Sequence, residues 1–369
     1  MRFRLEGGCD SSWIYANRIG FLWEMRKRLN TNAFLAASST IVACALFVGG
    51  YEVYQSHRYE DWKSAYERMI QQHDTLTIPS PNELLMWEYR PNAVFYDSSL
   101  KYKIQTNSYG FRDGEYELTR KEKYLVRVAF IGDSITLGLK VSEESTFVRR
   151  FEKLARDAYP DWKIQAMNFG IDGYQVIQIY ELLRTKVLRF LPDKVVYVMC
   201  LNDFDFDDAS GKKILYFKKP NSFFLKKLES LYKRLSQKEY HRYYFERNRR
   251  TAFHYLSKIR ELLDGEGIRF QVVLVPVFEE TDDGFKNYPL KDLHQRIAKI
   301  LNEFKIEVVD LSENFAKQDK APKDYAYDIW HPNEEGHWFI AQQLLRPVLQ
   351  SYFDAESAGG ADASHVEKN

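Results

Sequence analysis

The sequence predicts an α/β fold, in which five parallel strands form a sheet between two layers of helices, with an apolar helix ahead of it. Two observations predict this organisation. Short runs rich in β-branched and aromatic residues alternate with longer segments that carry apolar residues at helical spacing, as a parallel sheet requires. Near the N-terminus, the run from Ala33 to Tyr51 carries no charge, and its length approaches the ~20 residues that cross a ~30 Å hydrocarbon core.

The strands and helices of the main domain follow from this alternation. The predicted strands are Leu125–Ile131, Ile164–Met167, Lys194–Met199, Phe270–Val275 and Ile306–Val309. The predicted helices are Phe147–Ala158, Gln175–Phe190, Tyr244–Leu263, Leu290–Phe304 and Glu334–Leu345. Helix-breaking residues support these limits, because Pro192 precedes the third strand, Gly265 follows the third helix and Pro347 follows the last helix.

The uncharged run near the N-terminus predicts a single membrane span. Arg26, Lys27 and Arg28 precede the run and mixed charges follow it, so the positive-inside bias places the N-terminus in the cytoplasm and the main domain outside, in the periplasm or the extracellular space. Three alternatives remain open. The run is also compatible with a signal peptide cleaved at Ala43-Cys44-Ala45, with a lipobox-like Ile41–Cys44, or with a buried helix of a soluble protein.

The remaining chain divides by composition. We expect a cytoplasmic segment 1–32, a transmembrane anchor 33–51, a stalk helix with a strand-rich extension 52–123, a main domain 124–354 and a disordered tail 355–369. Within the extension, strands are predicted at Ala93–Tyr96 and Lys101–Thr106. In the turn that follows, we interpret Arg112 as a surface arginine, with the alternative that Arg112 or Asn107 reaches the edge of the functional site.

An insertion over residues 211–250 interrupts the alternation. It holds thirteen Lys and Arg residues against three Glu residues, interleaved with aromatic residues. The plainest interpretation is a solvated helical segment whose aromatic side chains pack on the core. A lid over the functional site and a contact with a membrane surface are the alternatives, because basic and aromatic residues together suit anionic headgroups.

Composition excludes several functions. A net charge of +1 gives no reason to expect nucleic-acid binding, and the sequence contains no phosphate-binding loop, dinucleotide fingerprint or zinc-like cluster. Of the three cysteines, Cys200 alone lies in the main domain, so we expect no disulfide there. The acidic run Asp203, Asp205, Asp207 and Asp208 is interpreted as a solvated loop. We therefore predict neither a metal nor a cofactor.

The candidate functional residues lie where predicted strands end. Ser134 follows the first strand in the turn Gly132-Asp133-Ser134, at the edge where open α/β sheets place their ligands. Asp328 and His331 share one short loop before the last helix. A serine hydroxyl becomes a nucleophile when a histidine removes its proton, and that histidine needs an acid to orient it. These three residues therefore predict a catalytic triad.

Two further residues can supply the donors that an acyl-transfer reaction needs. The tetrahedral intermediate carries an oxyanion, which must be met by fixed N–H groups. Gly173 follows the second predicted strand and Asn202 follows the third, on the edge that also carries Ser134. A glycine N–H and an asparagine amide are suitable donors.

These residues together resemble the SGNH or GDSL hydrolases, named for a Ser, Gly, Asn and His in four sequence blocks. Ser134 matches the nucleophile, Gly173 and Asn202 match the second and third blocks, and Asp328 with His331 matches the Asp-x-x-His block. The resemblance covers residues 124–352 and implies a flavodoxin-like strand order and an oxyanion hole formed by Ser134, Gly173 and Asn202. There are two departures: Ile135 replaces the usual leucine, and Cys200 replaces the glycine of the third block.

The resemblance and the predicted span imply a membrane-anchored, bacterial-type serine esterase. We expect it to hydrolyse O-acyl esters, O-acetyl esters in particular, on an envelope or secreted polysaccharide. The envelope polysaccharide machinery is the partner that this location implies. Three alternatives stay open: a polysaccharide O-acetyltransferase that uses the same acyl-serine chemistry, a lipid esterase or thioesterase, and a non-catalytic glycan-binding assembly protein.

Overall fold

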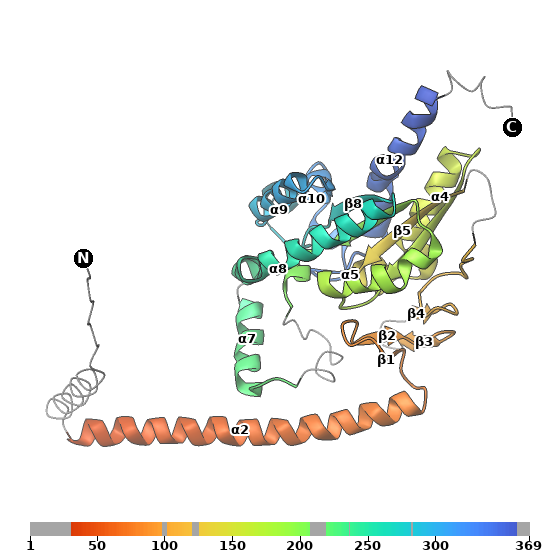
Figure 1. Cartoon of the computed structure of the whole chain (residues 1–369). Coiled ribbons are helices and arrows are strands. Elements are labelled where there is room, and N and C mark those ends of the chain that lie inside the picture. Colours follow the sequence, from red (N-terminus) through yellow and green to blue (C-terminus); the bar gives the residue numbers. More distant parts are fainter. Residues whose placement is uncertain are drawn as a thin grey trace, which may run out of the picture. The chain divides into compact units, whose positions relative to one another are not determined.

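The computed structural model describes residues 31–97, 102–119, 125–206, 219–235, 237–281 and 283–359. Its centre is a five-stranded sheet in the order β6-β5-β7-β8-β9, in which every neighbouring pair is parallel. Two of its strands, β5 and β8, are labelled in Figure 1. The predicted fold class is therefore confirmed. The strands are β5 (Leu125–Gly132), β6 (Lys163–Gly170), β7 (Lys194–Met199), β8 (Arg269–Leu274) and β9 (Glu307–Asp310).

Helices cover both faces of this sheet. Helix α4 (Phe147–Ala158) packs against α12 (Glu334–Gly359), and α5 (Val176–Thr185) packs against α8 (Gln237–Gly265). The chain passes through α4 from β5 to its neighbour β6 at the edge of the sheet, and then through α5 in the opposite direction, from β6 across β5 to β7. Crossovers between parallel strands are right-handed, so two crossovers in opposite directions place their helices on opposite faces of the sheet. Because both faces are covered, the strands are largely apolar, and every residue of β5 and β7 is buried.

Several predicted bounds differ from the observed ones. The helix predicted over 175–190 is divided into α5 and a 3-10 turn, η2 (Val187–Phe190), and α8 begins before the predicted Tyr244. Helix α9 (Lys291–Glu303) is one residue shorter at each end than predicted. The remaining short elements of the main domain are α3 (Ser134–Leu137), η1 (Glu143–Ser145), η3 (Leu201–Phe204), η4 (Gly284–Asn287), α10 (Leu311–Phe315) and α11 (Pro322–Tyr325).

The prediction that the last helix ends before Pro347 is wrong. Helix α12 contains Pro347 and continues to Gly359, so residues 355–359 of the expected tail are helical, and 360–369 lie outside the described residues. A proline removes one N–H from a helix, but its carbonyl remains an acceptor. The buried ammonium of Lys194 donates to the carbonyls of Pro347 and Val348, at 3.3 and 3.1 Å. These bonds fix the turn that contains the proline.

The N-terminal part contains one long helix, α2 (Thr31–Gln71), which joins the predicted span and the predicted stalk without a break. It is long and apolar enough to cross a membrane, with a mean hydropathy of 1.4 in its most apolar window. Residues 31–65 form a compact unit with residues 220–230, while the rest of the described chain forms a second unit. Residues 1–30 of the expected cytoplasmic segment lie outside the described residues.

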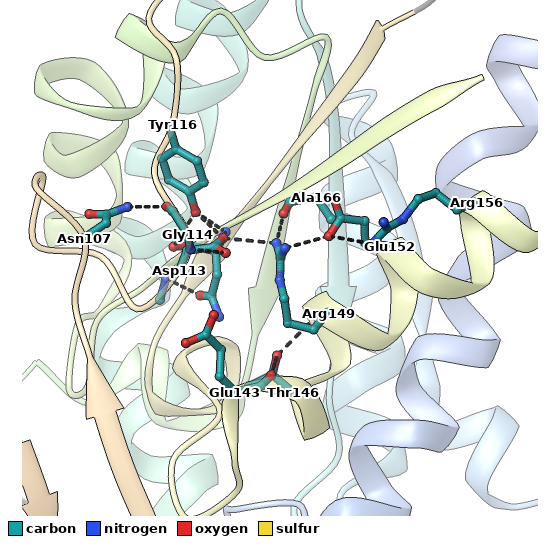
Figure 2. Close-up of polar contacts among 12 residues, drawn as sticks. Asn107, Asp113, Gly114, Tyr116, Glu143, Thr146, Arg149, Glu152, Arg156 and Ala166 are labelled. Carbon is teal, nitrogen blue, oxygen red and sulfur yellow. Dashed lines mark hydrogen bonds and ion pairs between the residues drawn. The ribbon is translucent and has the colours of Figure 1, made fainter. Parts of the chain in front are cut away.

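The extension forms two antiparallel hairpins. The predicted strands appear as β3 (Val94–Asp97) and β4 (Tyr102–Gln105), and a second hairpin, β1 (Thr77–Pro79) with β2 (Trp87–Tyr89), was not predicted. Asp113 follows these hairpins in the extension. Its carboxylate accepts the Asn168 N–H of β6 at 2.8 Å and pairs with Arg149 of α4 at 3.1 Å. Figure 2 shows Asp113 held between Tyr116 and Arg149. The extension is thereby fastened to the edge of the sheet.

The insertion contains α7 (Phe223–Leu235) and the first half of α8, residues 219–222 are not helical, and residues 207–218 and 236 lie outside the described residues. In α8, the side chains of Tyr240, Tyr244 and Phe245 are buried, which confirms the packing interpretation for that part. The ring of His241 lies edge-on to Trp330, with centroids 5.0 Å apart, so α8 also contacts the loop that carries His331.

Candidate active site

Ser134 opens the short helix α3 at the carboxyl end of β5. The Asp133 side chain caps this helix by accepting the Ile135 N–H at 2.9 Å. The backbone of α3 lies so close to the sheet that a Cβ built on Gly170 would be 2.1 Å from the Leu137 nitrogen. A glycine at the end of β6 is therefore required for α3 to hold Ser134 in this position.

His331 lies between Ser134 and Asp328. Its Nε2 is 3.1 Å from the Ser134 Oγ, and its Nδ1 is 2.9 and 3.0 Å from the two carboxylate oxygens of Asp328. Because a carboxylate only accepts, the Nδ1 carries the proton and the Nε2 of the neutral ring is left as a base facing the hydroxyl. The structure thus brings together the three residues predicted as a triad, across 197 positions of the chain.

The Asp328 carboxylate is fixed by its own loop. It accepts the backbone N–H groups of Trp330 and His331 at 2.8 and 2.9 Å. Burial by itself would raise the pKa of the Asp328 carboxyl, but the hydrogen bond and charge of His331, together with Lys140 and the Trp330 N–H, hold that pKa well below its usual range. The acid is therefore ionised whenever the histidine requires a negative partner.

Asn202 reaches the same end of the sheet from η3, which follows β7. Its Nδ2 donates to the Asp133 carboxylate at 3.0 Å, and this engages one of its two amide hydrogens. Burial raises the pKa of Asp133, while the bond from Asn202 acts to lower it. The structure therefore places Asn202 beside the Gly-Asp-Ser turn, with one amide hydrogen left over for another acceptor.

Gly173 lies in the turn after β6 with φ +78°, a left-handed conformation that favours glycine. Neither its N–H nor that of Ser134 donates a hydrogen bond to a residue in the described part of the chain. Two backbone donors near this edge of the sheet are thus available to an acceptor that is not part of the protein.

The substitution of cysteine for the family's glycine does not disturb the third block. Cys200 has φ −124° and ψ 168°, an extended conformation open to any residue, and its N–H donates to the buried carboxylate of Asp203 at 2.8 Å. Asp203 also accepts the hydroxyl of Tyr197, and burial raises its pKa well above the usual value.

The interpretation of the following acidic run as a solvated loop is wrong for Asp203 and Asp205, since both are buried. Asp205 accepts the Tyr240 hydroxyl of α8. Asp207 and Asp208 lie outside the described residues. Within the described ranges, no group of His, Cys, Asp or Glu residues could hold a metal ion.

The sequence did not identify Lys140 at the site, and it offered Arg112 only as the alternative to a surface arginine. Lys140 forms an ion pair with Asp328, and no sequence signal indicates it because the two residues are 188 positions apart. Arg112, interpreted as a surface residue, is 1% exposed. Its guanidinium donates to the carbonyls of Leu137, Gly138 and Val141 at 3.1, 2.5 and 2.7 Å. Arg112 is buried because these carbonyls belong to the end of α3 and the tight loop after it, where buried carbonyl groups need donors.

Comparisons with known proteins identify a family and distant structural neighbours. Residues 130–339 match the model of the GDSL-like lipase/acylhydrolase family. Among solved structures, an acetylxylan esterase from Geobacillus stearothermophilus is 20% identical, with a TM-score of 0.42, over 60% of this chain and 94% of that chain. A structure of a putative lipolytic protein of the G-D-S-L family from Desulfitobacterium hafniense is 14% identical, with a TM-score of 0.38, over 60% of this chain and 98% of that one. No curated protein matches the chain.

The matched residues, 130–339, are more than half of the 369-residue chain. Ser134 lies near the start of this range and His331 near its end. The five-stranded parallel sheet is the fold that the resemblance implies. The chain therefore belongs to the GDSL-like lipase/acylhydrolase family and is a hydrolase of ester bonds.

Proposed function

We propose that this protein is a membrane-anchored serine esterase that removes O-acyl groups, O-acetyl groups in particular, from an envelope or secreted polysaccharide. One observation carries the catalytic part of the proposal: the His331 Nε2 lies 3.1 Å from the Ser134 Oγ, while Asp328 holds the Nδ1. A nucleophile in hydrogen-bond contact with an oriented base is the arrangement that acyl transfer uses.

In this mechanism, His331 takes the proton of Ser134 as the Oγ attacks the ester carbonyl. The oxyanion is stabilised by the Ser134 N–H, the Gly173 N–H and the second amide hydrogen of Asn202. His331 then gives its proton to the departing alcohol. A water molecule, activated by the same histidine, releases the acyl group and restores the free serine.

Active-site labelling tests the nucleophile. The detergent-solubilised chain is incubated with a fluorophosphonate, and its turnover of a small acetyl ester is measured in parallel. We expect one label per chain and loss of both labelling and turnover in Ser134→Ala, with an unchanged melting temperature. Ser142→Ala is the matched control, because Ser142 is an exposed serine in the segment that follows α3. Turnover that persists in Ser134→Ala would remove the nucleophile assignment.

The membrane anchor is supported by α2, a helix apolar and long enough to cross a membrane, and the exported location by the basic residues Arg26, Lys27 and Arg28 ahead of it. The polysaccharide substrate is inferred from ester hydrolysis at that location. The acetyl content of the surface polymer in a deletion strain tests them. An esterase predicts that the polymer gains acetyl groups and that wild-type enzyme removes them, whereas Ser134→Ala does not. Loss of acetyl groups on deletion would instead identify an O-acetyltransferase. An unchanged polymer, with turnover rising along a series of longer acyl esters, would identify a lipid esterase or thioesterase.

A further inference from the structure

Helix α7 exposes a row of large apolar side chains. Leu225, Leu228 and Leu235 are 64%, 46% and 76% exposed, and Leu231 and Tyr232 are exposed as well. The same helix carries four Lys and Arg residues against one Glu in its sequence, and helical spacing places Lys226 and Lys227 off this row. A helix with one apolar face and a basic opposite face is typical of segments that lie in a membrane interface.

The start of α7 is bound to one point on α2. The carboxylate of Glu52 accepts the N–H groups of Phe223 and Phe224, both at 2.9 Å, and the hydroxyl of Ser222. The hydrogen bonds from Ser222 and these N–H groups lower the pKa of Glu52, so it stays ionised as an N-terminal cap. Glu52 is the first charged residue after the uncharged run 33–51. If that run spans a bilayer, α7 begins at the level of the headgroups.

Two ring contacts show which face of α7 points toward the apolar run. Phe224 contacts Tyr51, the last residue of the run, with centroids 6.0 Å apart, whereas Phe223 contacts Tyr59, with centroids 5.9 Å apart. Tyr59 is about 12 Å farther along α2 at ~1.5 Å per residue. The Phe224 side of α7 therefore faces the run, and the Phe223 side faces away from it.

The residues of α7 divide between these two sides by helical spacing. Residues three, four, seven and eleven positions apart share a face. The side that Phe224 occupies continues with Leu228, Leu231 and Leu235. The side that Phe223 occupies continues with Lys227 and Ser230. Within the unit of residues 31–65 and 220–230, the apolar row is thus a continuation of the apolar surface of α2.

We propose that α7 is an interfacial helix, which lies in the headgroup region of the bilayer with its apolar row among the upper acyl chains. We assign a lipid surface, not a protein, as the partner of this row, because its first part, through Leu228, is continuous with the apolar surface of α2 in the same unit and is flanked by basic residues that anionic headgroups attract. This inference depends on the membrane anchor proposed above, and the experiment separates the two.

Depth-dependent fluorescence quenching tests the position of α7. The full chain, with Cys9→Ser and Cys44→Ser, is labelled with a fluorophore at single introduced cysteines and reconstituted in vesicles of phosphatidylcholine and phosphatidylglycerol. Cys200 is buried, so the background variant should take no label. Nitroxide lipids then report contact with acyl chains. We compare Leu228→Cys on the apolar row, Lys227→Cys on the opposite side as its matched control, and Leu46→Cys within the apolar run.

We expect strong quenching at positions 46 and 228, and several-fold weaker quenching at 227. Quenching at 46 with equally weak quenching at 228 and 227 would overturn the interfacial helix and leave the anchor intact. Weak quenching at all three positions would overturn both. Disulfide formation between two chains at position 228, without quenching, would show that a second copy covers the row instead. Acetyl-ester turnover of each variant reports the proposed chemistry independently of these outcomes.

Discussion

Lys140 forms an ion pair with the Asp328 carboxylate that also accepts a hydrogen bond from the Nδ1 of His331. One carboxylate is thus shared between a permanent cation and an imidazole that becomes a cation during the proposed reaction. The charge of Lys140 lowers the electrostatic benefit that Asp328 gives to imidazolium. Lys140 is therefore placed to influence the protonation of the base from a position that does not touch Ser134.

Removing this charge should change the pH dependence of turnover. In Lys140→Met, Asp328 stabilises the protonated form of His331 more strongly, so the base is lost at a higher pH. We expect the acid limb of the profile of kcat/KM against pH to move upward by up to about one unit. Lys140→Arg should keep the wild-type limb. A lower rate with an unmoved limb in Lys140→Met would mean that Lys140 acts by packing alone.

Arg112 should be necessary for both stability and turnover. Its guanidinium joins the extension to three carbonyls in the loop that follows Ser134. Burial lowers the pKa of Arg112, while the nearby carboxylates of Glu143 and Glu144 act to raise it. In Arg112→Met, buried acceptors lose their donors, and each costs about 1–3 kcal/mol of the free energy of unfolding.

We therefore expect a lower melting temperature and a lower kcat for Arg112→Met. Arg112→Lys should restore little of either, because one ammonium cannot reproduce the planar fork of donors. Thermal melting and acetyl-ester kinetics measure the two effects. Wild-type kcat in Arg112→Met, at a temperature where the variant is folded, would show that the loop does not need this arginine to position Ser134.

The proposed oxyanion hole predicts the effect of losing Asn202. Asn202→Ala should lower kcat on the order of 10²–10³-fold, as expected for one missing donor. Because Asn202 also binds Asp133, some loss of stability should accompany it. Asn248→Ala is the control, since Asn248 donates to the Phe204 carbonyl of the same turn, η3, at 2.6 Å without reaching Asp133. Equal losses of kcat in both variants would assign Asn202 a structural role.

His337 predicts a loss of stability in acid. Its Nδ1 accepts the Phe147 N–H at 3.2 Å, and burial lowers its pKa to about 3. The unfolded histidine binds a proton near its ordinary pKa of about 6.5. Between these two values the unfolded state binds more protons, so the free energy of unfolding falls by up to about 1.4 kcal/mol for each pH unit lost.

The melting temperature should therefore decrease as the pH falls from about 6.5 toward 3. His337→Asn keeps an acceptor near the Phe147 N–H and cannot take up a proton in this range, so its melting temperature should depend less on pH. A variant whose melting temperature follows pH as steeply as that of wild type would show that other groups cause the acid instability.

The sequence by itself determined the α/β alternation, the apolar run and the residues at the carboxyl ends of the strands. These features depend on local patterns: β7 and α4 have the predicted bounds because periodicity and helix-breaking residues mark them within a few positions. The positions of Ser134, Asp328 and His331 could be predicted for the same reason, since each follows or precedes a recognisable element, and parallel strands bring such ends together.

Only the tertiary structure decided which distant groups share the site. No local pattern connects Lys140 with Asp328, although the two form an ion pair. Nor does one connect Arg112 with the loop after α3, to whose carbonyls it donates. Pro347 ended the helix in the sequence-based prediction, but the folded chain continues it and places Lys194 at its carbonyl. The physical reason is the same in each case: a buried charge or carbonyl must find a partner, and that partner is chosen by the packing of the whole domain.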